Sequence, residues 1–337
     1  MSDRFRVILF CSLLGGWRPI STHSAGLNNN VVATAISHQS GDRSQQPNPR
    51  EENPLEVRKL LLNYVQGGKL ADAIELGRDS VARWPDDPEL RHLLGLAYFK
   101  TRQNSAAITE LQHAESLDAS NPAIHFDFAL IYLDQDQYAP AADELEKAIK
   151  LDPSNALAHL LLGRAYQNTN RTVQGIEQFE TALKLNPRLP LGHYHLGFAL
   201  ASLGHNSEAI SEYRKEIAHN SEDAAVLYQL GHLLLQVGDW ESARLSLQKA
   251  TEINPRNGEA FYDLGKALVL ARDTDSAISA FERCAQLSPA DPSPHYQLAR
   301  TLDSEGKHDS AQQEWQRFDQ LTKAQPQTGG MATGRSQ

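Results

Sequence analysis

The sequence contains few cysteines, and this scarcity limits the kinds of site that it can form. Its 337 residues include only two, Cys11 and Cys284, which lie far apart in the chain. A disulfide framework needs several cysteines, and a structural zinc site needs clustered thiolate or imidazole ligands. The sequence therefore predicts neither kind of site. We expect Cys284 to be a small buried thiol.

A basic charge balance and a long apolar run are also missing. The formal net charge is -10, whereas a nucleic-acid-binding protein presents clustered Lys and Arg side chains to the phosphates. Between residues 51 and 337 no segment approaches the ~18 consecutive apolar residues of a membrane-spanning helix. We therefore expect neither nucleic-acid binding nor a membrane span in the mature chain.

The N-terminal part of the chain differs in composition from the rest. Arg4 and Arg6 precede the apolar run VILFCSLLGG at 7–16, which is the layout of an export signal, although the run is short. Residues 1–35 thus have two interpretations: a signal peptide, which implies a periplasmic or secreted protein, or a disordered leader, which implies a cytoplasmic one. Residues 36–53, rich in Ser, Gln, Asn and Pro, predict a disordered linker, and residues 326–337 a disordered tail.

Between the linker and the tail, the sequence repeats every 34 residues without insertion or deletion. The phrases HYHLGFAL, LYQLGHLL, FYDLGKAL and HYQLARTL recur at this step from His193. A fixed period of this length is typical of stacked helical repeats. The eight units predicted over residues 54–325 are 54–87, 88–121, 122–155, 156–189, 190–223, 224–257, 258–291 and 292–325.

Small and apolar residues recur at fixed positions of this unit. Position 8 is Gly or Ala in seven units and position 20 in all eight, which predicts close approach of two helices there. Positions 4, 7, 8 and 11 form one helical stripe, and positions 20, 21, 24, 27 and 28 form a second. Gly, Asn or Asp often stands at position 15, where a left-handed C-cap is expected, and Pro often stands at position 32, where a helix must stop. Each unit therefore predicts two helices and two turns.

The pattern resembles the tetratricopeptide repeat family, which carries Leu at 7, Gly at 8, Tyr at 11, Ala at 20 and 27, and Pro at 32. The resemblance covers residues 54–325, and the first and last units fit it least well. It implies an all-α fold: a right-handed superhelical solenoid of antiparallel helix hairpins. It also implies a concave groove lined by the first helix of each hairpin, mainly through positions 2, 5, 9, 12 and 13.

Transferred by position, the groove is predicted to be aromatic and partly basic toward the C-terminal end. Tyrosine at position 5 of four successive units would form a ladder of rings with hydroxyls that can bond a peptide backbone. The alternative is that these rings pack between neighbouring first helices. The charges would suit an extended peptide with acidic side chains, unless they are simply solvated. The predicted partner-binding residues are Phe126, Arg164, Tyr194, Phe198, Tyr228, His232, Tyr262, Lys266, Tyr296 and Arg300.

Neither a catalytic nor a metal site is predicted. His125, His159, His193 and His295 all occupy position 4, but successive copies fall on helices about 10 Å apart, too far to share one ion. We interpret them as structural. The sequence contains no glycine-rich phosphate loop, no Gly-x-Ser-x-Gly and no His-Glu-x-x-His, and it predicts no cofactor.

Two hypotheses for function follow. The first is a non-catalytic scaffold that binds a peptide or segment of a partner protein in the concave groove. The second is an accessory or adaptor subunit of an extracytoplasmic complex for envelope assembly or secretion, which contacts its partners through the convex face or the repeat ends. The two differ in whether the export signal is real and in which face makes contact.

Overall fold

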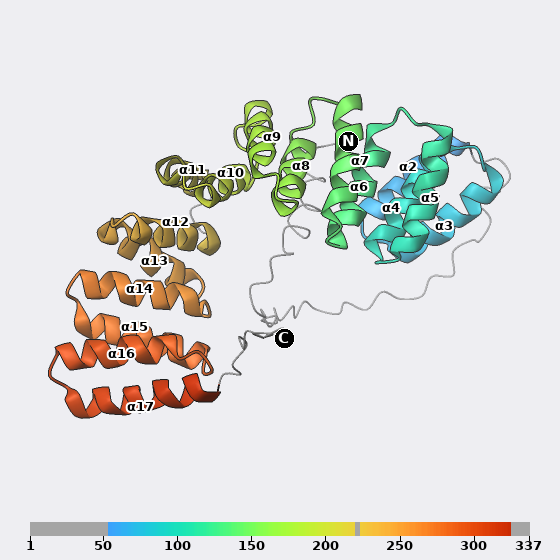
Figure 1. Ribbon diagram of the computed structural model, residues 1–337. Coiled ribbons are helices and arrows are strands. Elements are labelled where there is room, and N and C mark those ends of the chain that lie inside the picture. The colour runs from blue at the N-terminus through green and yellow to red at the C-terminus, as the bar shows by residue number, and fades with distance from the viewer. Residues whose placement is uncertain (1–52, 220–222, 325–337) are drawn as a thin grey trace, which may run out of the picture. The chain divides into compact units, whose positions relative to one another are not determined.

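Paired helices account for the secondary structure of the described chain (Figure 1). The computed structural model describes residues 53–219 and 223–324, and within these ranges it contains sixteen helices and no strand. The all-α prediction of stacked helix hairpins is confirmed. The interpretations placed on residues 1–35, on most of 36–53 and on 326–337 lie outside the described residues.

Each hairpin has a first and a second helix. The first helices are α2 (Pro54–Gln66), α4 (Pro88–Lys100), α6 (Pro122–Asp134), α8 (Ala156–Asn168), α10 (Gly192–Ser202), α12 (Ala224–Gln236), α14 (Gly258–Leu270) and α16 (Ser293–Ser304). The second helices are α3 (Leu70–Arg83), α5 (Asn104–Leu117), α7 (Tyr138–Leu151), α9 (Thr172–Leu185), α11 (Asn206–His219), α13 (Trp240–Ile253), α15 (Thr274–Leu287) and α17 (His308–Ala324).

The chain divides into two compact units between Asn186 and Pro187. The first unit contains helices α2–α9 and the second contains α10–α17. Within each unit the two helices of a hairpin pack together, and the second helix of one hairpin packs on the first helix of the next, as α3 does on α4 and α13 on α14. Each hairpin thus covers the apolar stripe that its neighbour leaves open.

The small residues at positions 8 and 20 face each other inside the hairpins, as the period predicts. A Cβ atom on Gly175 would lie 2.9 Å from the carbonyl oxygen of Gly163, and one on Gly163 would lie 3.0 Å from that of Gly175. A Cβ atom on Gly231 would likewise lie 3.3 Å from the carbonyl oxygen of Ala243. The spacing of the helix axes in a hairpin therefore depends on the absence of larger side chains there.

Position 15 adopts the left-handed conformation in every hairpin. The four glycines there have φ between 74° and 85°, and Asp136 and Asn170 have φ of 56° and 61°. The prediction for these residues is confirmed. Arg102 and Arg272, at the same position, also have positive φ of 62° and 60°. The hairpin imposes this turn even on residues that do not favour it.

Most first helices begin at an Asn or Asp side chain that accepts backbone N–H bonds from the first turn. Position 34 is the site of this cap, but in the fourth repeat it is Leu189, which has no acceptor. Helix α10 starts later, at Gly192, after Leu191 with φ of 60°. The buried carboxylate of Glu216 from α11 accepts the N–H bonds of Leu191 (3.0 Å) and Tyr194 (3.3 Å) instead. The capping residues of the other first helices in this group are Asn53, Asp87, Asn121, Asn155, Asp223 and Asn257.

Positions 4 and 23 carry matched side chains that join the two helices of a hairpin. Where position 4 is His or Arg, position 23 is Glu or Gln, and the two are hydrogen bonded. The pairs are Arg91–Glu110 (3.0 Å), His125–Glu144 (2.7 Å), His159–Gln178 (2.8 Å), His193–Glu212 (2.6 Å) and His295–Glu314 (2.6 Å). The position-4 histidines therefore hold the helices of a hairpin together, which is the structural role that we expected of them.

Candidate functional site

Four tyrosines at position 5 lie on the four successive first helices of the second unit. Tyr194, Tyr228, Tyr262 and Tyr296 belong to α10, α12, α14 and α16, and each side chain is half-buried. We call this set the tyrosine ladder. Each of its members is one helical turn before a position-9 residue, so positions 5 and 9 share one face of each helix.

One side of the ladder packs against the second helix of the same hairpin. The ring of Tyr194 lies 6.1 Å from that of Tyr213, and the ring of Tyr262 lies 5.9 Å from that of Phe281. Tyr296 contacts Trp315 with a centroid distance of 5.4 Å. These rings therefore contribute to the hairpin core while part of each remains open to solvent.

Two ladder hydroxyls connect neighbouring first helices. The Tyr228 hydroxyl donates to Glu259 Oε2 at 3.1 Å, and the Tyr262 hydroxyl accepts from Gln297 Nε2 at 3.2 Å. Burial raises the pKa of Tyr194 to about 12, and burial together with the Glu259 charge raises the pKa of Tyr228. These phenols therefore stay protonated at neutral pH and keep their capacity to donate a hydrogen bond.

A buried carboxylate holds two of the predicted cationic groups. Asp263 is 4% exposed, and it lies 2.6 Å from His232 Nδ1 and 3.0 Å from Lys266 Nζ. The hydrogen bond to Asp263 outweighs burial and raises the pKa of His232. Burial alone would raise the pKa of Asp263, but the hydrogen bonds from His232 and Lys266 lower it. The positive charge expected at position 9 is thus partly neutralised inside the protein.

The remaining predicted residues have different surroundings. Phe198 is half-buried with its ring 6.5 Å from that of Tyr194, and Arg300 is exposed with its guanidinium 5.6 Å from the centre of the Tyr296 ring. In the first unit Phe126 is only 5% exposed. Arg164, also in the first unit, is half-buried, and burial lowers the pKa of its guanidinium.

Position 6 is the part of the site that the sequence did not reveal. Asp263 and Gln297 both occupy it, and each binds a residue at position 9 or 5 of the preceding repeat, across 31 or 35 residues. In the first unit Asp127 lies 2.6 Å from His92 Nε2 in the same way. A polar residue at position 6 that follows a His or Tyr in the preceding repeat is the signal that could have predicted these contacts.

The described residues contain no group of three His, Cys, Asp or Glu side chains placed to hold a metal ion. The only described cysteine, Cys284, is 2% exposed, and burial raises the pKa of its thiol to about 11, as expected of an inert core residue. Among the helices between Pro54 and Ala324, none combines the length and apolarity needed to cross a membrane.

Family models match several stretches of the sequence. A model described as tetratricopeptide repeat matches residues 228–292, and another of the same description matches 156–189. A TPR repeat model matches 129–170, and a model of anaphase-promoting complex, cyclosome, subunit 3 matches 66–148. No curated protein matches the sequence.

Several solved structures share this fold at low sequence identity. A protein from Cytophaga hutchinsonii is 17% identical with a TM-score of 0.59, covering 72% of this chain and 99% of its own. PilF from Pseudomonas aeruginosa is 20% identical with a TM-score of 0.56, covering 61% and 94%. YrrB, described as having an unusual peptide-binding site, is 21% identical with a TM-score of 0.50, covering 55% and 96%.

Proposed function

Because the chain belongs to the tetratricopeptide repeat family, a scaffold for protein interactions, we propose that its tyrosine ladder binds an extended segment of a partner protein. The family is generally non-catalytic, and the function proposed here needs no chemical step. The observation that carries the proposal is the succession of four half-buried tyrosines on adjacent first helices of one unit.

The chemistry of the ladder favours a peptide as ligand. Each ring offers a rigid apolar surface at low conformational cost. The Tyr262 hydroxyl accepts from Gln297 and can still donate to a backbone carbonyl, whereas the Tyr228 hydroxyl donates to Glu259 and can still accept a backbone N–H. The glutamate and glutamine that hold Tyr228 and Tyr262 fix the orientation of these side chains before a ligand arrives. Such preorganisation reduces the entropy lost on binding.

The charges near the ladder argue against recognition by charge alone. Asp263 sits between His232 and Lys266, and Glu259 accepts the Tyr228 hydroxyl. Two carboxylates therefore accompany the two cations, and an acidic peptide would gain little net attraction. We propose that ring contacts and backbone hydrogen bonds provide most of the affinity, and that Arg300 at the end of the ladder adds a single exposed positive charge.

One structural neighbour bears on the choice of a peptide as ligand. YrrB has the same fold and is described as a TPR protein with an unusual peptide-binding site. That site is a property of YrrB, and its resemblance to this chain concerns the fold. It supports the idea that a stack of such hairpins can accommodate a peptide.

The test is affinity capture with the full chain as bait, followed by mass spectrometry and quantitative rebinding of each captured protein. We expect the double variant Tyr228→Ala, Tyr262→Ala to weaken rebinding by about ten-fold or more, since loss of a central aromatic contact typically costs about 2 kcal/mol. Far-UV circular dichroism must show that the variant is still folded at the assay temperature.

Two control variants separate the ladder from general damage. Leu245→Ala changes a side chain on α13 that is 59% exposed, and we expect it to leave rebinding unchanged. Tyr228→Phe keeps the ring but removes the bond to Glu259, so it should retain most of the affinity. If every captured protein rebinds equally well to the double alanine variant and to the wild type, the ladder is not the binding site.

A further inference from the structure

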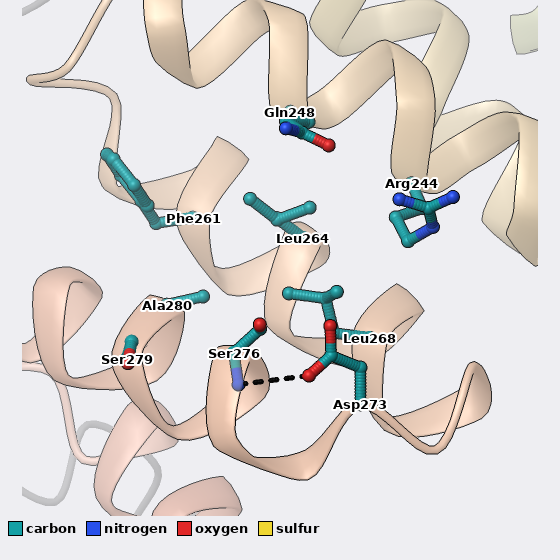
Figure 2. Close-up of a pocket in the computed structure, with 9 residues that line it drawn as sticks. All are labelled: Arg244, Gln248, Phe261, Leu264, Leu268, Asp273, Ser276, Ser279 and Ala280. Atoms are coloured by element: carbon teal, nitrogen blue, oxygen red, sulfur yellow. Dashed lines mark hydrogen bonds between the residues drawn. The ribbon is translucent and has the colours of Figure 1, made fainter.

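The seventh hairpin is one of three that lack the hydrogen-bonded pair at positions 4 and 23. Five hairpins carry a polar pair at these positions, whereas this one has Phe261 and Ala280. Ala280 leaves space where those five hairpins place a Glu or Gln side chain. A pocket of about 500 Å³ opens there, lined by residues of α13, α14 and α15 (Figure 2).

A second departure from the repeat pattern meets the same pocket. Arg244 on α13 occupies position 21, which is apolar in six of the other seven hairpins. Among the described residues, Arg244 has no ion pair and no hydrogen bond, although its side chain is half-buried at the pocket wall. A half-buried guanidinium at the wall of an open pocket is placed to form charge-assisted hydrogen bonds with a ligand anion. The apolar residues at this position elsewhere are Ile74, Ile108, Ala142, Ile176, Ile210 and Ile278.

The pocket has an apolar part and a charged part. Phe261, Leu264 and Ala280 lie toward one end, and Arg244 and Asp273 toward the other (Figure 2). The Asp273 carboxylate accepts the backbone N–H of Ser276 at 3.3 Å and so serves as the N-cap of α15. Asp273 keeps its negative charge while it caps α15, and Arg244 is the one positively charged residue in the pocket lining.

We propose that this pocket binds a bulky apolar side chain of a partner protein, with an adjacent carboxylate of the same segment paired to Arg244. The apolar part would accept a ring or a branched side chain, because Phe261, Leu264 and Ala280 line it. The carboxylate would form the charge-assisted hydrogen bonds that Arg244 lacks within the described chain.

This site is separate from the tyrosine ladder and does not rest on the function proposed above. Phe261 and Tyr262 are consecutive residues of α14, so their side chains point to different sides of the helix. The pocket opens between the second helices α13 and α15, whereas the ladder belongs to the first helices. One unit would thus contact partner segments at two places.

The test uses short synthetic peptides and the full chain, observed by saturation-transfer difference NMR, which detects weak binding. The probes share a Gly/Ser frame and carry Phe-Asp, Ala-Asp or Phe-Asn at the centre. We expect the Phe-Asp peptide to bind about ten-fold more tightly than Ala-Asp, because only the ring fills the apolar part. It should bind several-fold more tightly than Phe-Asn, because only the carboxylate pairs with Arg244.

The chain itself provides variants that should fold. Phe261→His with Ala280→Glu installs the pair found in the third, fifth and eighth hairpins, and it should fill the pocket and abolish binding. Arg244→Ile installs the residue typical of position 21, and it should remove the preference for Asp over Asn but retain the preference for Phe. Leu227→His with Ser246→Glu makes the matched change in the sixth hairpin and should leave binding unchanged.

The outcomes decide between the pocket and other surfaces. Binding that survives the Phe261→His, Ala280→Glu change, or equal binding of the Phe-Asp and Ala-Asp peptides, would overturn the proposal. A preference for Asp that persists in Arg244→Ile would also overturn it. The Tyr228→Ala, Tyr262→Ala variant should bind the peptides like the wild type, so a failed ladder and a failed pocket give different results.

Discussion

At the scale of single residues, the fit between two side chains sets how closely a hairpin can close. Gly265 at position 8 faces Phe281 at position 24, which is fully buried. A methyl group on Gly265 would lie 2.5 Å from Phe281 Cε1. The third hairpin has a larger residue at position 8, Ala129, and a smaller one at position 24, Leu145. Between these two hairpins, a larger residue at position 8 goes with a smaller residue at position 24.

This relation predicts that the effect of Gly265→Ala on the free energy of unfolding changes sign when Phe281 is replaced by Leu. Gly265→Ala should lower the free energy of unfolding by up to about 2 kcal/mol, since overpacking costs about 1–3 kcal/mol and the helix propensity of alanine returns about 1 kcal/mol. In a Phe281→Leu background the same substitution should raise it by up to about 1 kcal/mol, because the hairpin then matches the third one. Urea unfolding of the four proteins measures both effects. A loss of equal size in the two backgrounds would show that the residues are not coupled.

The hydrogen bond between His232 and Asp263 predicts a pH dependence of stability. It raises the folded-state pKa of His232 above the unfolded value of about 6.5. The stabilisation is therefore fully present below about pH 6.5 and is lost as the pH rises through the folded-state pKa. Charged groups facing His232 are Asp263 and Glu259, which favour its protonation, and Lys266, which opposes it.

The variant His232→Gln isolates this contribution. We expect the difference in free energy of unfolding between wild type and variant to be larger near about pH 6 than near about pH 9. Chemical denaturation at the two pH values measures it. His205→Gln is the control and should cost little stability at either pH, because this side chain is 53% exposed and its hydrogen bond is to the nearby, exposed Glu208. A difference for His232→Gln that does not change with pH would contradict the assignment.

At the scale of helices and hairpins, polar side chains at fixed positions decide where helices begin and how they pair. Because a hydrogen-bonded pair at positions 4 and 23 can be replaced by an apolar pair, the hairpin needs matched partners more than it needs charge. Removing one partner leaves the other unsatisfied, whereas removing both leaves nothing unpaired.

Exchanging one pair for the other tests this account. We expect His295→Leu and Glu314→Ser to lower the free energy of unfolding by about 1–3 kcal/mol each. The double variant copies Leu227 and Ser246 of the sixth hairpin, and it should cost less than either single change. A double-mutant cycle measured by urea unfolding gives the interaction free energy between the two side chains. If the two losses simply add, the side chains act independently.

The cap of α10 gives a second prediction at this scale. Glu216→Ala should lower the free energy of unfolding by about 0.5–2 kcal/mol, because it removes the acceptor for the N–H groups of Leu191 and Tyr194. Glu208→Ala, on the same helix but exposed, is the control and should change it by less than about 0.5 kcal/mol. Thermal and urea unfolding measure both. Equal effects would mean that Glu216 is not the cap.

At the scale of the whole molecule, the sequence predicted what is repeated and missed what differs between repeats. The helix pairs, the left-handed turns at Gly68 and Asn170 and the close contact of positions 8 and 20 follow from local spacing and side-chain size. They could be predicted because the residues that cause them recur at the same positions of successive repeats.

Contacts made once could not be predicted in the same way. The bond between His232 and Asp263 joins residues of different repeats. Glu216 caps α10 because Leu189 stands where most other repeats have a capping Asn or Asp. The pocket beside Phe261 arises only when side chains from three helices are placed together. Partner-binding roles for the ladder stay predictions, since they depend on a ligand.

The division between Asn186 and Pro187 leads to the last prediction. In a stack of repeats, each hairpin depends mainly on its immediate neighbours, and about three repeats suffice for a stable core. Each unit contains four hairpins. We therefore expect fragments 54–186 and 187–324 to fold separately, and the sum of their far-UV circular dichroism spectra to reproduce the spectrum of 54–324.

A cut inside the first unit is the matched control. Dividing the chain after Pro153 separates α7 from α8, which pack together, and leaves the fourth hairpin without its preceding neighbour. We expect this pair of fragments to lose helical signal relative to 54–324 and to melt at a lower temperature. If the cut at Asn186 is as damaging as the cut at Pro153, the two units depend on each other for folding, and the nearest-neighbour account of this chain is wrong.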